Sequence, residues 1–199
     1  TALAAGFGLL LARYGGQQAL RFALGVSGGA GMRRSGNLMP LCLQPDLGAG
    51  FGAAITATAD ALAALQTRAL PSETLVQERL ARENADPFPL GALALHWQDN
   101  RPLPPGITRI HRPAPPASGE LVLTAEDRGD GIRLIADAAE GRLQPALAGR
   151  MLTHLARLLE QGLADPDAPV GRMALLSQAE LTDLSAPYPD DGPIDPRAT

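Results

Sequence analysis

Lysine is absent from this chain, so all 17 of its basic residues are arginine. Cysteine is nearly absent too. Because Cys42 is the only one, no disulfide can form within the chain, and we expect a reducing, cytoplasmic environment. The formal net charge of -4 gives no electrostatic reason to expect nucleic acid or an anionic membrane as a partner. With the many Ala, Gly and Pro residues, the arginine-only usage suggests a GC-rich bacterial genome.

Long hydrophobic runs are also missing. The run from Leu3 to Ala12 is far shorter than the roughly 20 apolar residues that a membrane-spanning helix needs. It lacks the basic leader of a signal sequence, so we predict a buried helix there. Hydrophobic residues make up 45% of the chain and charged residues 19%, which is typical of a globular domain with its own core.

Apolar segments of two periodicities alternate along the chain and predict an α/β fold. The predicted strands cover residues 20–26, 38–43, 90–98, 121–125 and 132–136. The predicted helices cover residues 1–14, 47–65, 72–80 and 145–163. Thr1 is expected to cap the first helix and Gly15-Gly16 to end it. Asp130-Gly131 predicts the positive backbone angles of a tight hairpin turn.

Ser27 is the one candidate nucleophile. Gly25-Val26-Ser27-Gly28-Gly29 fits the G-x-S-x-G pattern of a serine hydrolase, in which a strand leads through a sharp turn into a helix. The following residues, 30–36, are a poor helix start. We therefore favour a plain glycine-rich loop and keep a hydrolase as a minor alternative.

The three histidines do not form a recognisable site. His96, His111 and His154 have no second histidine or cysteine at metal-ligand spacing. His154 lies beside the apolar stripe of the last long helix and is expected to be a partly buried packing residue. We predict no catalytic, metal-binding or cofactor-binding residue from these patterns.

Several segments, in order, resemble the C-terminal half of a nonribosomal peptide synthetase condensation domain. GNLMPLCL (36–43) is similar to the family segment N-T-L-P-L-R, and PSETLVQERL (71–80) is similar to P-F-E-x-L-V. The remaining matches are the opening helix (1–16), the strand and glycine-rich loop (22–31), the strand PLGALALHWQ (89–98), and the leucine-rich helix with its following stretch (150–184).

The resemblance implies a chloramphenicol-acetyltransferase-like half-domain, with a mixed sheet flanked by helices. Residues 1–184 would form the lobe, interrupted by a Pro-rich loop at 99–119, and residues 185–199 a flexible linker toward an adenylation domain. The family condenses thioesters held on phosphopantetheine arms, using a His-His-x-x-x-Asp-Gly motif that this sequence lacks. Where the family has an arginine paired with that aspartate, this chain has Cys42.

We therefore expect a truncated, non-catalytic condensation-like module with a structural or interaction role. Its expected partners are an adjacent adenylation domain and a carrier protein bearing phosphopantetheine, or a second copy covering the exposed inter-lobe face. No nucleic acid or membrane partner is expected. Two alternatives stay open: half of an active condensation domain whose N-terminal lobe is supplied elsewhere, and an epimerisation-type domain, against which the adenylation-type linker argues.

Overall fold

The computed structural model describes residues 1–26, 37–66, 78–79, 82–83, 93–98, 121–141 and 143–185. Its helices and strands follow one another in the order α1 (Ala2–Gly15), β1 (Leu20–Val26), β2 (Asn37–Leu43), α2 (Phe51–Gln66), β3 (Leu93–Gln98), β4 (Leu121–Asp127), β5 (Ile132–Ala138), α4 (Pro145–Ala164), the 3-10 turn η1 (Val170–Arg172) and α5 (Gln178–Ser185). Each predicted strand and long helix that falls on described residues is present, with boundaries shifted by a few positions.

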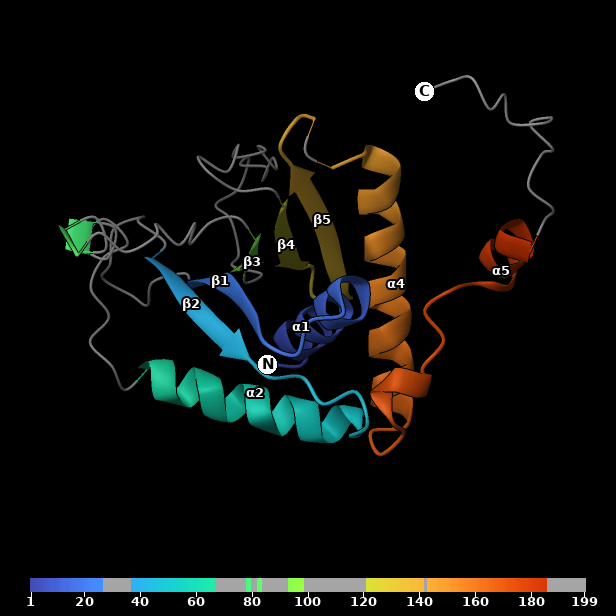
Figure 1. Cartoon of the computed structure of the whole chain (residues 1–199), viewed down its shortest axis with the longest axis horizontal. Coiled ribbons are helices and arrows are strands. Elements are labelled where there is room, and N and C mark those ends of the chain that lie inside the picture. The colour runs from blue at the N-terminus through green and yellow to red at the C-terminus, as the bar shows by residue number, and fades with distance from the viewer. Residues whose placement is uncertain are drawn as a thin grey trace, which may run out of the picture.

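The five strands form one mixed sheet in the order β2-β1-β3-β4-β5. The three central strands β1, β3 and β4 run parallel, and an antiparallel strand closes each edge. Figure 1 shows the helices α1, α2 and α4 gathered beside this sheet, with α5 standing apart beyond α4. The predicted α/β class, a mixed sheet flanked by helices, is confirmed.

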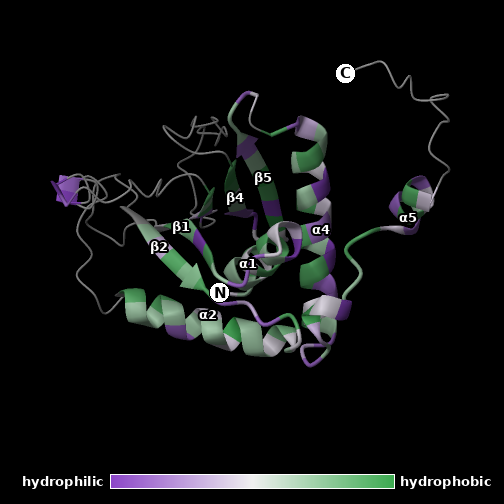
Figure 2. Ribbon diagram, in the orientation of Figure 1, coloured by the Kyte–Doolittle hydropathy of each residue, from purple (hydrophilic) through white to green (hydrophobic). Residues whose placement is uncertain are grey.

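The core lies between one face of the sheet and the helices α1 and α4. Phe22 on β1 meets Phe7 of α1 edge to face, with ring centroids 5.2 Å apart. Leucines on the same face of neighbouring strands extend this contact to Met151 and Leu155 of α4. Figure 2 colours the residues by hydropathy and shows hydrophobic and hydrophilic residues alternating along α4. They alternate because only one side of this helix is buried.

Helix α1 is buried over most of its length, as the sequence predicts, because small residues let it approach its neighbours. A Cβ added to Gly8 would come 2.8 Å from Leu43 of β2, and one added to Gly6 would come 2.8 Å from Leu159 of α4. Gly16 ends the helix in the left-handed conformation (φ 62°). Thr1 occupies the N-cap position as predicted, but its side chain makes no capping hydrogen bond. The first turn is closed by the backbone bond from Ala5 N to Thr1 O.

The β4–β5 hairpin is present, but its turn uses a different glycine from the one predicted. Arg128 N donates to Gly131 O, and the positive φ of 84° falls on Gly129 instead of Gly131. The carboxylate of Asp127 accepts a hydrogen bond from Gly129 N at 2.8 Å. A side-chain acceptor two residues before the amide stabilises this turn, and the glycine with positive φ lies two residues before the one that the Asp-Gly pattern indicates.

A backbone clasp joins the start of α2 to the chain that follows α4. Gly52 N donates to Pro166 O at 2.9 Å, Val170 N to Ala49 O at 3.0 Å, and Gly171 N to Leu47 O at 2.7 Å. Gly50 pairs with Pro169 in the same clasp and leaves no room for a Cβ beside Asp167. Two segments more than 110 residues apart therefore hold each other through their main chains.

The other face of the sheet is also buried at its centre. Ala23 of β1 and Ala94 of β3 are almost fully buried there, as are Thr124 and Glu126 of β4. Glu126 is 1% exposed, and its carboxylate pairs with Arg128 at 2.5 Å. Central parallel strands buried on both faces are typical of an α/β sheet.

Several predictions lie outside the described residues. These are Ser27 and its glycine-rich loop, most of the 71–80 segment, the Pro-rich loop 99–119 with His111, and residues 186–199. Within the described part of the chain, every helix is too short or too polar to cross a membrane.

Candidate functional site

The side chains of α1 and α4 hold the C-terminal stretch of the described chain, which we call the strap and define as residues 170–185. It consists of η1, an extended stretch and α5. None of the α5 side chains is buried, so the helix is not held by a hydrophobic face of its own. Its attachment therefore depends on polar contacts reaching it from the body of the lobe.

His154 of α4 lies at the centre of these contacts and is only 4% exposed. Its Nδ1 is 2.6 Å from the Tyr14 hydroxyl of α1, and its Nε2 is 2.9 Å from Glu180 Oε1 of α5. An ionised carboxylate can only accept, so Nε2 carries a proton and donates to Glu180. In the neutral ring Nδ1 then accepts from the Tyr14 O–H. Both ring nitrogens are thus occupied by residues from two other helices.

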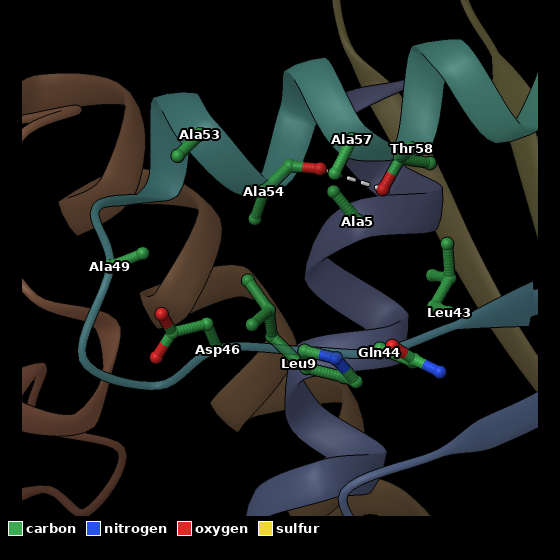
Figure 3. A pocket seen from close by; sticks show the side chains of 11 residues that line it. Ala5, Leu9, Leu43, Gln44, Asp46, Ala49, Ala53, Ala54, Ala57 and Thr58 are labelled. Atoms are coloured by element: carbon green, nitrogen blue, oxygen red, sulfur yellow. Dashed lines mark hydrogen bonds between the residues drawn. The ribbon is translucent and has the colours of Figure 1, made fainter.

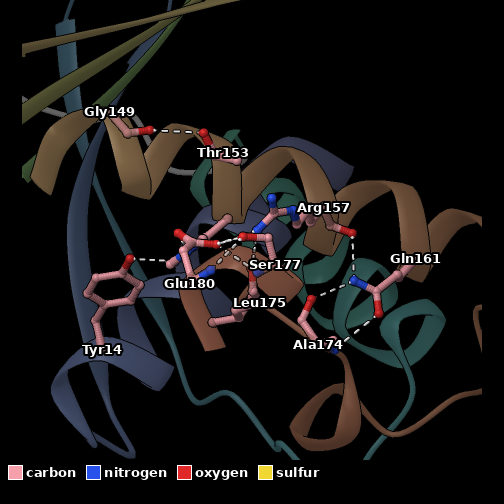
Figure 4. Close-up of polar contacts among 10 residues, drawn as sticks. Tyr14, Gly149, Thr153, Arg157, Gln161, Ala174, Leu175, Ser177 and Glu180 are labelled. Atoms are coloured by element: carbon pink, nitrogen blue, oxygen red, sulfur yellow. Dashed lines mark hydrogen bonds and ion pairs between the residues drawn. The ribbon is translucent and has the colours of Figure 1, made fainter. Parts of the chain in front are cut away.

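The carboxylate of Glu180 accepts hydrogen bonds from three residues, as Figure 4 shows. Besides His154, Arg157 of α4 donates to Oε2 at 2.8 Å, and Ser177 donates both its backbone N–H (2.7 Å) and its hydroxyl (2.6 Å). These bonds favour the charged form, with the two from Ser177 contributing most, and they hold the pKa of Glu180 far below its ordinary value. The carboxylate is therefore the point at which α5 is fixed.

Ser177 and Glu180 also form a capping box at the start of α5. The Ser177 hydroxyl accepts a hydrogen bond from Glu180 N at 3.2 Å while Glu180 bonds back to Ser177 N. The S-x-x-E spacing that signals this motif is present in the sequence, and our sequence interpretation missed it. The same carboxylate that starts the helix also pins it to α4.

Two further side chains hold the carbonyls of the strap. Arg13 of α1 donates to Val170 O at 3.2 Å and to Met173 O at 2.5 Å. Gln161 of α4 makes a two-way pair with the backbone of Ala174, at 2.7 and 3.1 Å. Burial lowers the pKa of Arg13, since the charged form loses part of its hydration there.

A cleft of about 750 Å³ lies between α4 and α5 and is floored by the His154 network. Its apolar walls include Leu147 of α4 together with Leu181 and Leu184 of α5, and Arg150 lies at its rim. Burial and the nearby Glu180 raise the pKa of Tyr14, while the Arg150 charge opposes this shift. The cleft therefore combines apolar walls with one exposed cation, Arg150.

A second, smaller cavity of about 280 Å³ lies between α1, α2 and the end of β2 (Figure 3). Alanines from both helices supply most of its wall, with Leu9, Leu43 and Thr58 beside them. The Thr58 hydroxyl is satisfied within α2 by Ala54 O at 2.8 Å. This cavity offers no charged group inside its wall except Asp46, and we assign it no chemistry.

The histidines play different roles from those the sequence indicated. His154 is buried as predicted, but it acts through hydrogen bonds at both nitrogens as well as through packing. His96 lies on β3 against Gly25, where a Cβ would come 2.7 Å from its Nδ1, and burial lowers its pKa. Among the described residues no group of three or more histidine, cysteine or acidic side chains gathers to hold a metal ion.

Cys42 lies on the edge strand β2, exposed, directly across from Arg21 of β1. It is the position that resembles the arginine of the family segment. The structure thus places a small thiol where the resemblance would put a long cation.

The fold is that of about half of a condensation domain, so the resemblance predicted from the sequence is confirmed. The starter condensation domain of rhizomide synthetase superposes with a TM-score of 0.66 at 20% identity, covering 88% of this chain and 44% of that one. The first condensation domain of the CDA synthetase gives 0.65 at 18%, covering 88% and 42%. The complex of the X-domain and OxyB from teicoplanin biosynthesis gives 0.67 at 16%, covering 88% and 42%.

In sequence, the chain is similar to surfactin synthase subunit 1 of Bacillus subtilis (strain 168). The two are 34% identical over 85 residues, which is 39% of this chain and 2% of that protein. The chain thus spans under half of the solved structures and a small fraction of the synthetase. No protein-family model matches it.

Proposed function

We propose that this chain serves as the C-terminal lobe of a condensation-type unit in a peptide synthetase, and that it acts there as a non-catalytic structural and interaction module. Its role is to hold the chain that leads toward an adenylation domain. The observation that carries the proposal is the fixing of α5 by a single network through Tyr14, His154 and Glu180.

The His154 network supports a structural role because it leaves no imidazole nitrogen free for proton transfer. A general base must present an unoccupied nitrogen to its substrate, whereas both nitrogens of His154 are bonded within the fold. The other described histidine, His96, packs against the backbone of β1, and burial disfavours its charged form. These contacts support a structural role for both histidines.

Cys42, on the edge strand β2, also supports a non-catalytic role. The resemblance implies an arginine here that pairs with the aspartate of the catalytic motif. A thiol cannot make that ion pair, so a catalytic lobe docking on β2 would bury an aspartate without its partner, at considerable cost. Cysteine at this position therefore favours a unit that does not catalyse condensation.

The expected partners follow from the synthetase context. We infer that a carrier protein with its phosphopantetheine arm and an adenylation domain are the neighbours of this lobe. One of the structural neighbours, the X-domain, is found in a complex with OxyB, which illustrates that a condensation fold can serve in a protein–protein assembly.

The direct test compares binding with chemistry. The 199-residue chain is mixed with aminoacyl and peptidyl phosphopantetheine thioesters, and dipeptidyl product is measured by mass spectrometry. Binding to the adenylation domain of the same synthetase is measured by calorimetry, using Glu180→Ala and, as control, Glu160→Ala. We expect no product above buffer, and binding that weakens only in Glu180→Ala.

Two results would overturn the proposal. Product formed by the chain, alone or with an added His-His-x-x-x-Asp-Gly lobe, would establish the half of an active condensation domain. Labelling of Ser27 by a fluorophosphonate, lost in Ser27→Ala, would establish the hydrolase.

A further inference from the structure

The cleft between α4 and α5 is open to solvent and carries leucines on both of its walls. On α5, Leu181 and Leu184 lie one turn apart and are 46% and 73% exposed. Leu147 of α4 lines the facing wall. Figure 1 shows α5 on the side of α4 away from the sheet, so a second molecule can approach α5 without meeting the sheet. Exposed leucines gathered on a concave surface are typical of a contact site.

Most of the charged groups that line the cleft are already used within the lobe. The Glu180 carboxylate accepts hydrogen bonds from Ser177 and from α4, and Arg13 donates to two carbonyls of the strap. Two exposed charges remain, Arg150 on the α4 wall and Asp183 on the α5 wall. Within the described ranges, neither of these two side chains forms an ion pair. The two walls therefore present opposite charges that one chain does not join.

We propose that a second copy of this chain occupies the cleft, so that α4 and α5 of two molecules pair about a two-fold axis. In this pair, Asp183 of each copy faces Arg150 of the other. Leu181 and Leu184 of each copy lie against Leu147 of the other. A symmetric contact of this kind requires one surface patch to be complementary to itself. The cleft meets this requirement, because one wall is apolar and cationic and the other is apolar and anionic.

The contact is small, so the pair should be weak and should depend on concentration. Helix α5 has eight residues and is about 12 Å long, and it supplies one side of each contact. Contacts of this size fall at the low end of specific interfaces, where association is transient. The leucines supply the attraction as their apolar surface leaves water, and the charge pairs fix the orientation. We expect a dissociation constant on the order of 100 μM.

Sedimentation equilibrium of the 199-residue chain tests the pairing. Between about 10 and 500 μM, the apparent mass should rise from 20.7 kDa toward twice that value. Leu181→Ser combined with Leu184→Ser should stay monomeric over the same range. Leu163→Ser is the matched control and should pair like the wild type, because Leu163 of α4 is 59% exposed but does not line the cleft. A monomer mass at every concentration would overturn the proposal.

A charge swap tests the orientation of the pair. Arg150→Asp should raise the dissociation constant on the order of tenfold, because repulsion replaces attraction at both symmetric contacts. Asp183→Arg should have the same effect, and the two substitutions together should restore pairing, since the charges then match again. Arg172→Asp, an exposed change on η1 outside the cleft lining, controls for net charge.

Two further outcomes would refute the proposal. One is a double variant that pairs no better than either single variant while its circular dichroism matches the wild type. The other is a dimer that is indifferent to Leu181, Leu184 and the charges, because its contact would then lie on another surface of the lobe.

The pairing and the proposed function fail separately. The pairing is measured on this chain alone, whereas the proposed function is tested by binding to an adenylation domain and by the search for condensation product. A chain that stays monomeric and still binds the adenylation domain would remove only the pairing. A chain that pairs through the cleft and forms dipeptidyl product would remove only the proposed function.

Discussion

His154 Nε2 and Glu180 Oε1 lie 2.9 Å apart and join two helices of very different stability. Helix α4 has 20 residues and a buried stripe, whereas α5 has eight and none. Short helices without a packed face are marginal in water, so α5 exists in this position because of the side chains that meet it. Substitutions at the His154–Glu180 contact should therefore show whether these side chains hold α5 in place.

Removing the Glu180 carboxylate should release α5 and leave the rest of the lobe intact. Glu180→Ala removes the bonds from His154, Arg157 and Ser177 at once, including half of the capping box. We expect hydrogen exchange of residues 178–185 to rise on the order of tenfold, since charge-assisted hydrogen bonds are among the stronger ones. Exchange in α1 and α4 should change little. Glu160→Ala on the exposed side of α4 is the control, and a similar effect there would contradict this account.

Acid should detach α5 before it unfolds the core. The pKa of Glu180 is depressed in the folded protein, so its stabilisation is complete above the pKa of a free glutamate, at about 4.3, and is lost as pH falls toward the lower, folded value. Exchange in residues 178–185 should therefore increase progressively below about pH 4 relative to the core. In Glu180→Gln this pH dependence should disappear. A wild-type profile as flat as that of the variant would show that the carboxylate does not hold α5.

Two glycines of α4 offer a matched pair for testing how tightly the helices pack. A Cβ at Gly162 would meet the ring of Phe51, 2.6 Å from Cδ1, whereas a Cβ at Gly149 would meet nothing within 4 Å. Gly149→Ala should stabilise the fold by about 0.5–1 kcal/mol, the ordinary gain for alanine inside a helix. Gly162→Ala should destabilise it by about 1–3 kcal/mol, because Phe51 must move. Urea unfolding measures both, and equal effects would mean that α2 and α4 are less closely packed.

His96 should make the fold more sensitive to mild acid. Burial lowers its pKa, so the unfolded chain takes up a proton first as pH drops below about 6.5 and the folded state loses stability in that range. In His96→Gln the fall in unfolding free energy between pH 7 and pH 5 should be smaller than in the wild type. The other histidines are the same in both proteins, so the difference isolates His96. Identical slopes would place His96 in contact with solvent.

The sequence was sufficient for the fold because the fold follows from periodic patterns. The apolar spacing of residues 147–163 predicts α4, and Gly15-Gly16 correctly predicts the end of α1. The conformation of the β4–β5 turn was harder to predict. The positive φ falls on Gly129, two residues before the glycine of the Asp-Gly pattern, and Gly129 N donates to the Asp127 carboxylate. The sequence does not reveal which of several nearby side-chain acceptors will bond to a backbone N–H in a turn.

Of the site, only the Ser177–Glu180 capping box was predictable from the sequence. Ser177 and Glu180 are three residues apart and carry a recognisable motif, but Tyr14 and His154 are 140 residues apart in the chain. No periodicity links such distant residues, and they meet only because α1 and α4 pack on the same face of the sheet. The sequence therefore predicts only a packing residue at position 154, whereas His154 bonds to Tyr14 of α1 and Glu180 of α5 and so links three helices.

The backbone clasp between residues 47–52 and 166–171 gives the lobe a graded response to mechanical load. Tension applied at the C-terminal side would first detach α5 by breaking the hydrogen bonds to Glu180. It would next break the hydrogen bonds that Arg13 and Gln161 make to the strap. The backbone hydrogen bonds of the clasp, which connect the start of α2 to the chain after α4, would resist further extension. Since those bonds lie side by side and share the force, the lobe can yield at its edge while its core keeps its shape.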